Sequence, residues 1–199
     1  MKLEELIELH YITPLANIPS IYTHGILSHK MTQKLEHKSI SMQEIQERRA
    51  QVIVPGGRPL HEYVNLYFDA RNPMMFLRKA AHLDLCVLRI APSVLNIPGV
   101  VITDRNASSG YALFKPAPQG LAIVDKELVF AKDWTHADLI EYWNRKSAKN
   151  AEVLVPDRVD PRFILGAYVS CPESEEVLVK TKDNTTIIDI VVNGQLFFR

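Results

Sequence analysis

The segment LHEYVNLYFDARNPMMF, residues 60–76, constrains the fold more than any other part of the chain. Residues 63–68 alternate in character and are rich in aromatic and β-branched side chains, as is typical of a strand. Residues 69–73 then interrupt the pattern with Asp, Asn and Pro, which favour turns. We therefore expect a strand at 63–68 that delivers aromatic side chains to a cleft.

Strand signals dominate the rest of the chain, especially its second half. Short apolar or alternating runs predict further strands at 52–54, 83–90, 100–103, 151–155, 163–170, 177–180, 186–192 and 195–198. Asn193-Gly194 has the chemistry of a type I′ turn, so we expect the last two strands to form a hairpin.

Three helices are predicted between these strands. Asn17 has the character of an N-cap for a helix at 17–24, and a capping-box pattern from Ser41 predicts a solvated helix at 41–49. A third helix is predicted at 139–149. For the first ten or so residues, periodicity leaves open a helix or a strand at 9–13. The residues alone indicate an α/β or α+β domain.

Length, charge and composition narrow the class of protein. A chain of 199 residues predicts one domain, residues 1–199. Lys+Arg and Asp+Glu both total 23, so any contact with nucleic acid must use a local basic patch. The two cysteines and the histidines lack metal-ligand spacing, and we expect no metal. Without a signal peptide or a long apolar run, we expect no membrane contact and a soluble, cytoplasmic bacterial protein.

Glu152 is the only charge in the short apolar strand AEVLV. Two interpretations remain open. The side chain could point to solvent at a sheet edge, as strand carboxylates commonly do. Alternatively, a rigid strand could hold a catalytic carboxylate beside a cleft, where reactions that pass through an oxocarbenium ion need an anion.

Arg48 and Arg49 end the polar helix at 41–49, where cations are favourable on helix-dipole grounds alone. One of them could instead turn inward, because a guanidinium suits a diphosphate. Tyr63, Tyr67 and Phe68 could be core aromatics or the stacking wall of a binding cleft. No dinucleotide fingerprint or Walker loop is present, which disfavours a Rossmann or P-loop site.

Several blocks in order resemble the DarT family of DNA ADP-ribosyltransferase toxins. These blocks are HYITPLANIPSIYTHGILS, IQERR, LHEYVNLYF, ARNPM, TDRNAS, EYWN and AEVLVP, and they span roughly residues 9–170. The resemblance implies an α+β fold of the diphtheria-toxin-like and PARP-like class, with a split central β-sheet and flanking short helices. It also implies NAD as co-substrate, ADP-ribose transfer to a base in single-stranded DNA, and a macrodomain antitoxin partner, DarG.

Position by position, the resemblance makes Glu152 the catalytic glutamate and places the functional arginine in IQERR. Of that pair we prefer Arg49 to Arg48. In the first block, either His10 or Tyr11 would reach the adenosine ribose. The other cofactor contacts that the resemblance implies are Thr13, Asn17, Tyr63, Tyr67, Phe68 and Met74.

One loop departs from the family pattern, because Asp104-Arg105-Asn106 stands where Asp-Gly-His is usual. Thymidine is the acceptor that the resemblance favours. Guanosine in DNA, an RNA or protein acceptor, and a non-catalytic NAD-binding module are the alternatives.

Overall fold

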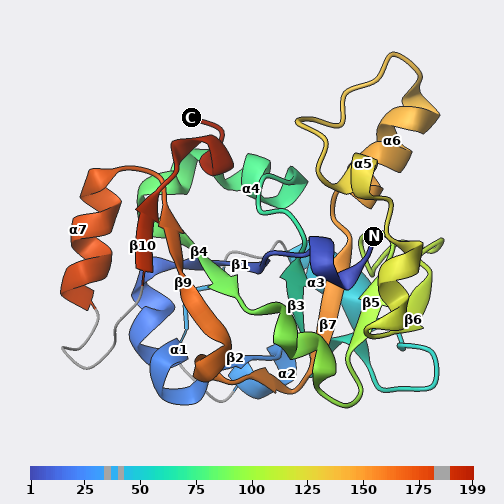
Figure 1. Cartoon of the computed structure of the whole chain (residues 1–199), viewed down its shortest axis with the longest axis horizontal. Coiled ribbons are helices and arrows are strands. Elements are labelled where there is room, and N and C mark those ends of the chain that lie inside the picture. Colours follow the sequence, from blue (N-terminus) through green and yellow to red (C-terminus); the bar gives the residue numbers. More distant parts are fainter. Residues whose placement is uncertain (34–36, 40–42, 182–188) are drawn as a thin grey trace.

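The computed structural model describes residues 1–33, 37–39, 43–181 and 189–199. An eight-stranded sheet crosses the molecule in the order β10-β9-β4-β1-β3-β7-β5-β6 (Figure 1). Neighbouring strands are antiparallel except for the parallel pair β10 and β9. The strands of this sheet are β1 (Leu9–Pro14), β3 (Tyr63–Tyr67), β4 (Leu85–Ile90), β5 (Val101–Thr103), β6 (Phe114–Pro116), β7 (Glu152–Pro156), β9 (Ile164–Val169) and β10 (Asp189–Val192).

Short helices surround the sheet. The α-helices are α1 (Ile18–His24), α2 (His29–Thr32), α3 (Gln43–Ala50), α4 (Pro73–Arg78), α5 (Lys126–Val129), α6 (Leu139–Ala148) and α7 (Pro172–Thr181). The 3-10 helices are η1 (Leu3–Glu5), η2 (Leu15–Asn17), η3 (Leu60–Glu62), η4 (Lys79–Asp84), η5 (Pro92–Asn96), η6 (Gln119–Ile123), η7 (Pro161–Phe163) and η8 (Gly194–Phe197). A small second sheet pairs β2 (Ile26–Leu27) with β8 (Arg158–Val159). In the described part of the chain, no helix is long and apolar enough to cross a membrane.

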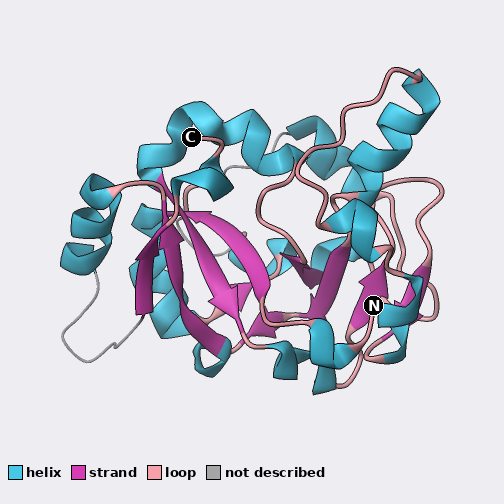
Figure 2. Ribbon diagram, turned by 45° about the horizontal axis from the view of Figure 1, so that its top comes forward, coloured by secondary structure: helices cyan, strands magenta, loops and turns pink. Residues whose placement is uncertain are grey.

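The sheet is split where β1 meets β3, and Figure 2 shows the strands in two groups. β1 pairs with β4 over its whole length, from Leu9 to Pro14. It pairs with β3 at one register position only, His10 opposite Tyr67. The rest of β1 and β3 therefore diverge, which leaves room between the two halves. The α+β class with a split sheet and short flanking helices is confirmed.

Three apolar clusters pack on the sheet, the smallest of them around Tyr63 and Leu154. The other two lie on its opposite faces. The larger one includes Leu9, Ile18, Phe68 and Val153 and covers most of the buried hydrophobic residues. The smaller one lies behind α4, where Phe197 packs with the strand residues Ile12, Tyr67, Leu85 and Val87 and with Ala70 and Met75. Burying an aliphatic or aromatic side chain of this size contributes about 1.5–3 kcal/mol.

Most predicted elements are present, with shifted ends. Residues 9–14 form a strand, which resolves the ambiguity of the first segment in favour of β1. The predicted helices correspond to α1, α3 and α6, although residues 41–42 of the second lie outside the described part. The strand predicted from residue 83 begins at Leu85, because η4 occupies the residues before it. Residues 186–188 of another predicted strand also lie outside the described part, and β10 begins at Asp189.

Several predicted elements are wrong, among them the strand at 195–198, because residues 194–197 form η8. Residues 52–54 form no strand, only an isolated bridge between Ile53 and Pro59. Residues 177–180 belong to α7, whose Ser174 and Leu178 are buried one turn apart. The predicted hairpin is absent, because β10 runs parallel to β9 and the chain after it turns into η8. Local Asn-Gly chemistry was outweighed there by the burial of Phe197.

A polar network spans β1, β4 and β9 on one face of the sheet. The Glu8 carboxylate accepts hydrogen bonds from Arg89 Nε at 2.7 Å and from the Tyr168 hydroxyl at 2.7 Å. His10 Nε2 lies 3.2 Å from the same carboxylate. Burial raises the pKa of Glu8, but the hydrogen bonds from His10, Arg89 and Tyr168 together outweigh it and lower that pKa to about 2.

We expect Glu8→Gln to lower the free energy of unfolding by ~1–2 kcal/mol at pH 7, because the charged hydrogen bonds to the carboxylate are lost. The value is smaller than the pKa shift alone would give, because solvent screens the charge of this partly exposed carboxylate. A carboxyl whose folded pKa is depressed stabilises the fold above its unfolded pKa, and that contribution disappears as pH falls toward about 2. Urea denaturation at pH 7, 4 and 2.5 should therefore show the variant and the wild type converging in acid. Glu4→Gln, an exposed position in η1, serves as the control. An equal difference at all three pH values would contradict the assignment.

Candidate active site

The centre of the candidate site is a buried ion pair between Arg49 and Glu152. Arg49 Nη1 donates to both carboxylate oxygens of Glu152, each at 3.0 Å. Glu152 is 0% exposed and Arg49 is 6% exposed. Buried charges persist in proteins only when they are paired, so each of these residues fixes the position of the other.

The strand and the loop beside it position Glu152. Glu152 is the first residue of β7, and its backbone N–H donates to Thr103 Oγ1 of β5 at 3.1 Å. The Thr103 hydroxyl in turn donates to the carbonyl of Arg105 at 2.7 Å. The N–H of Ala107 approaches Glu152 Oε1 at 3.5 Å. The solvent-facing interpretation of Glu152 is therefore excluded.

The last turn of α3 separates the two arginines. Arg48 points to solvent and pairs with Glu44 one turn earlier, at 2.5 Å, with 61% of its side chain exposed. Arg49 lies about 100° further around the helix and points inward. The geometry therefore places Arg49, rather than Arg48, against the glutamate.

Burial raises the pKa of the Glu152 carboxyl, and this effect exceeds the opposing effects of the Arg49 charge and its hydrogen bonds. Tyr67 lies directly opposite Glu152 in the register of β3 and β7, so the two side chains share a face. Burial, followed by the nearby Glu152 charge, raises the pKa of Tyr67 as well. The site thus holds a carboxylate that is more basic than an exposed one and a phenol that stays neutral.

A cavity of about 400 Å³ occupies the split between β1 and β3, within the range of small-molecule sites. Arg49 reaches its wall, whereas Glu152 lies behind the guanidinium. The predicted residues that border the cavity are Tyr11, Thr13, Asn17, Arg49, Tyr67 and Met74. Among the described residues, no group of three or more His, Cys, Asp or Glu could hold a metal ion.

Three other predicted contact residues lie away from the cavity wall. His10 is held between the carbonyl of Phe68, 3.1 Å from Nδ1, and Glu8. Phe68 follows the last residue of β3 and packs in the large core cluster. Tyr63 shares the face of Tyr67 but packs at the far end of β3 with Val54 and Leu60. Of His10 and Tyr11, the structure therefore places Tyr11 at the cavity.

Asn17 does not cap α1. Its backbone is in the helical region, and its side chain makes no capping hydrogen bond. Instead its amide forms a reciprocal pair with the backbone of Lys38, donating to the carbonyl at 2.9 Å and accepting from the N–H at 3.0 Å. It also donates to Thr13 Oγ1 at 3.3 Å. Asn17 thereby ties residues 37–39, which border the cavity, to β1 and α1.

The sequence analysis missed several residues of the cavity wall. Those with polar or aromatic side chains include His29, Asn65, Asn106, Trp143, Lys146 and Asn150. Asn65 carried a signal, because a polar side chain at the centre of a predicted strand shares the face of Tyr67. Trp143 and Lys146 share one face of the predicted helix and Asn150 follows it, but the sequence did not show that these residues border the cavity.

Comparison with known proteins then identifies the family. A family model described as "ssDNA thymidine ADP-ribosyltransferase, DarT" matches residues 10–198. The chain belongs to the DarT family. This membership agrees with the split sheet and with the position of the Arg49–Glu152 pair at its junction.

Relatives and solved structures of the family resemble the chain over nearly its whole length. A DNA ADP-ribosyl transferase–DNA ADP-ribosyl glycohydrolase fusion protein of Thermosipho africanus is 32% identical over 203 residues, covering 96% of this chain and 49% of the relative. The chain therefore spans about half the length of that fusion protein. Thermus sp. 2.9 DarT in complex with ADP-ribosylated ssDNA is 26% identical with a TM-score of 0.82, covering 97% of each chain. The same DarT in complex with NAD+ is 25% identical with a TM-score of 0.79, covering 97% of this chain and 98% of that one.

We expect Arg49→Met to destabilise the protein by ~3–5 kcal/mol at pH 8, because it leaves the Glu152 charge buried without a partner. The double variant Arg49→Met/Glu152→Gln should recover much of that loss. Thermal or urea unfolding of the four members of this cycle measures the coupling. Additive effects of the two substitutions would show that the pair is not coupled in the folded protein.

Proposed function

We propose that this chain transfers ADP-ribose from NAD to a thymidine base in single-stranded DNA. One observation carries the proposal. The Arg49 guanidinium, backed by the buried Glu152 carboxylate, faces a cavity at the split of a DarT-family sheet. The Thermus DarT structures with NAD+ and with ADP-ribosylated ssDNA support both the co-substrate and the acceptor.

The side chains that border the cavity fit NAD in their chemistry. Tyr11 and Tyr67 offer planar apolar surface for a ring, and Thr13 and Asn65 offer a hydroxyl and an amide for ribose and carboxamide. Asn17 holds the backbone of Lys38 at the edge of the cavity. We assign cofactor binding to these residues together with Met74. NAD supplies the ADP-ribose, whose ribose carbon gains positive charge as the bond to nicotinamide breaks. Ordered side chains that surround the reacting centre lower the barrier by fixing its orientation.

We assign catalysis to Arg49 and Glu152. The base nitrogen of the acceptor must lose a proton as it forms the new bond to the ribose carbon. Glu152 is the proton acceptor that this chain offers, because burial raises the pKa of its carboxyl. Because Glu152 lies behind Arg49, the proton passes through the guanidinium: Arg49 gives one N–H proton to the carboxylate as it takes the proton of the base nitrogen. Its positive charge is thereby kept and holds the cofactor in place.

Residues 1–199 would form one catalytic domain, acting on DNA in the bacterial cytoplasm. A macrodomain antitoxin that removes the modification would be its partner. The Thermosipho relative supports this partner, since it joins a DNA ADP-ribosyl transferase to a DNA ADP-ribosyl glycohydrolase in one chain.

Incubation with NAD and a thymine-containing single-stranded oligonucleotide should yield a product heavier by one ADP-ribose, detected by mass spectrometry. Glu152→Gln should lower the rate by ~10²–10⁴-fold, as loss of general base catalysis does. Lys180→Gln, an exposed position on α7, serves as the control. Parallel reactions test other acceptors: oligonucleotides without thymine, oligonucleotides with guanine as the only base, RNA and protein. Modification confined to one of these other acceptors would replace the thymidine assignment, and NAD binding without nicotinamide release would indicate a non-catalytic module.

A further inference from the structure

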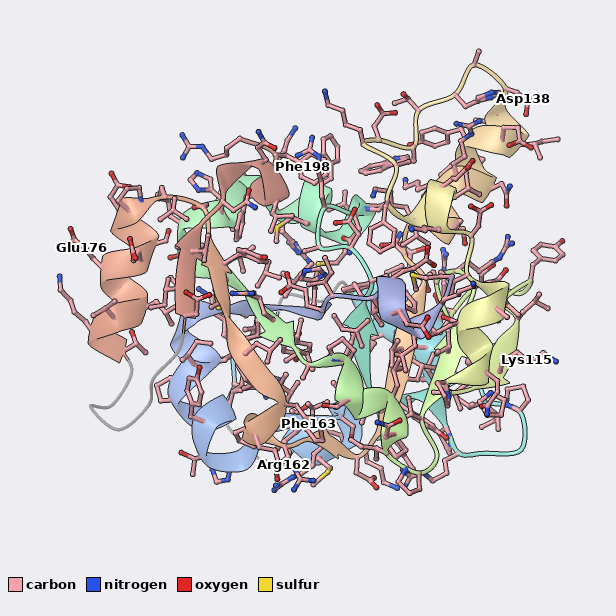
Figure 3. All side chains as sticks on the ribbon, in the orientation of Figure 1. Lys115, Asp138, Arg162, Phe163, Glu176 and Phe198 are labelled. Atoms are coloured by element: carbon pink, nitrogen blue, oxygen red, sulfur yellow. The ribbon has the colours of Figure 1, made fainter. Side chains whose placement is uncertain are left out.

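A line of side chains on one face of α6 leads from solvent to the cavity. Leu139, Trp143 and Lys146 recur at positions i, i+4 and i+7 of α6, which share one side of a helix, and Asn150 follows just after the end of α6. The last three border the cavity, whereas Leu139 is 66% exposed. Figure 1 shows α6 projecting from the body of the molecule, and Figure 3 places Asp138, its N-cap, at the outer end.

Trp143 is held in place yet remains open to solvent. The Lys146 ammonium lies 4.7 Å from the centroid of the indole, and the Tyr142 ring meets it at 78° with centroids 5.3 Å apart. Even so, 55% of Trp143 is exposed. Stacking platforms for nucleic-acid bases have this combination of an immobilised aromatic ring and a nearby cation.

Core packing does not account for Trp143. Within α6, Ala148 is the residue that is buried, while Leu139, Ile140 and Trp143 all expose more than half of their surface. In the part of the chain that the structure describes, Lys146 makes no ion pair with a carboxylate. Its charge is therefore available to a phosphate, which matters in a chain whose net charge is zero.

Depth within the cavity distinguishes this surface from the cofactor site. Arg49 and Tyr67 are 6% and 8% exposed, so they form the floor, whereas Trp143 lies at the mouth. A base that reacts at the floor must leave its strand neighbours near the mouth. A flat indole at that position can stack a neighbouring base whatever its identity.

We propose that Trp143 stacks the nucleotide adjacent to the acceptor base, with Lys146 neutralising the phosphate of that nucleotide. This inference rests on the proposed function, because it takes single-stranded DNA as the acceptor. Trp143 is thus a binding residue for the DNA strand, and it sets how the acceptor base enters the cavity.

Intrinsic fluorescence provides a direct test without turnover. The chain has two tryptophans, and Trp134 is only 8% exposed, so changes in emission on titration report mainly on Trp143. Titrating wild-type protein with a short thymine-containing single-stranded oligonucleotide, at low salt and without NAD, should quench that emission. Trp143→Phe should lose the quenching and retain binding, measured by anisotropy of a labelled oligonucleotide.

Substitution of Trp143 should weaken DNA binding more than it affects the cofactor. We expect Trp143→Ala to raise the Kd for the oligonucleotide by about 5- to 150-fold, and its KM for DNA to rise by more than its KM for NAD. Lys146→Gln should reduce the slope of log Kd against log salt by about 1. Ile140→Ala is the matched control on the same helix, 78% exposed and outside the cavity wall, and should leave the Kd unchanged.

A change in the DNA tests the same contact on folded wild-type protein. Oligonucleotides with an abasic site on either side of the acceptor thymidine should bind less tightly to the wild type at one of the two positions. Trp143→Ala should not distinguish that oligonucleotide from the intact one. An unchanged Kd for Trp143→Ala, or equal binding of the abasic and intact strands, would overturn the proposal. If the wild type modified no DNA at all, the proposed function would be wrong. If it modified DNA normally but Trp143→Ala or the abasic strands left binding unchanged, only the stacking role of Trp143 would be wrong.

Discussion

The buried contact between Arg49 and Glu152 joins residues 103 positions apart and sets the arrangement of everything around it. Removing both charges from water costs several kcal/mol per ion, and the two hydrogen bonds and the Ala107 N–H offset only part of that cost. An apolar pair of similar volume would satisfy the fold as well or better. The presence of an ion pair here is therefore better explained by chemistry than by stability.

The divergence of β1 and β3 gives that chemistry its space. Because the two halves of the sheet are joined by a single register pair, the edges of both strands border the cavity rather than each other. Helix α3, which precedes β3 in the chain, and helix α6, which follows it, both contribute side chains to the wall of this opening. A continuous sheet with the same strands would bury Arg49 and Glu152 with no route for a substrate.

Elements with strong local patterns could be predicted from the sequence. The alternation at 63–68 and the short apolar run around Glu152 correspond to β3 and β7, because their side chains face the core on both sides of a central strand. The choice between Arg48 and Arg49 could not be derived locally, since only the position of β7 in space distinguishes the two helix faces. Tyr67 and Phe68 were predicted to line one cleft, but β3 ends at Tyr67 and Phe68 packs in the large core cluster instead.

The errors near the C-terminus have the same cause. Asn-Gly is a strong local turn signal, but the parallel pairing of β10 with β9 is a contact between distant segments and determines the direction of the chain. The contribution of Trp143 and Lys146 to the cavity was missed for the same reason. Their helix was predicted, yet its place beside the cavity depends on the path of the segment between β6 and α6, which contains η6 and α5.

Phe197 of η8 supports the wall of the cavity from a segment far along the chain. Its ring is fully buried against Tyr67 and Ile12, which border the cavity from the other side. The back of the aromatic wall is thus built from η8, a segment whose residues do not border the cavity. Any substitution that loosened the packing of Phe197 would therefore disturb the aromatic wall from behind.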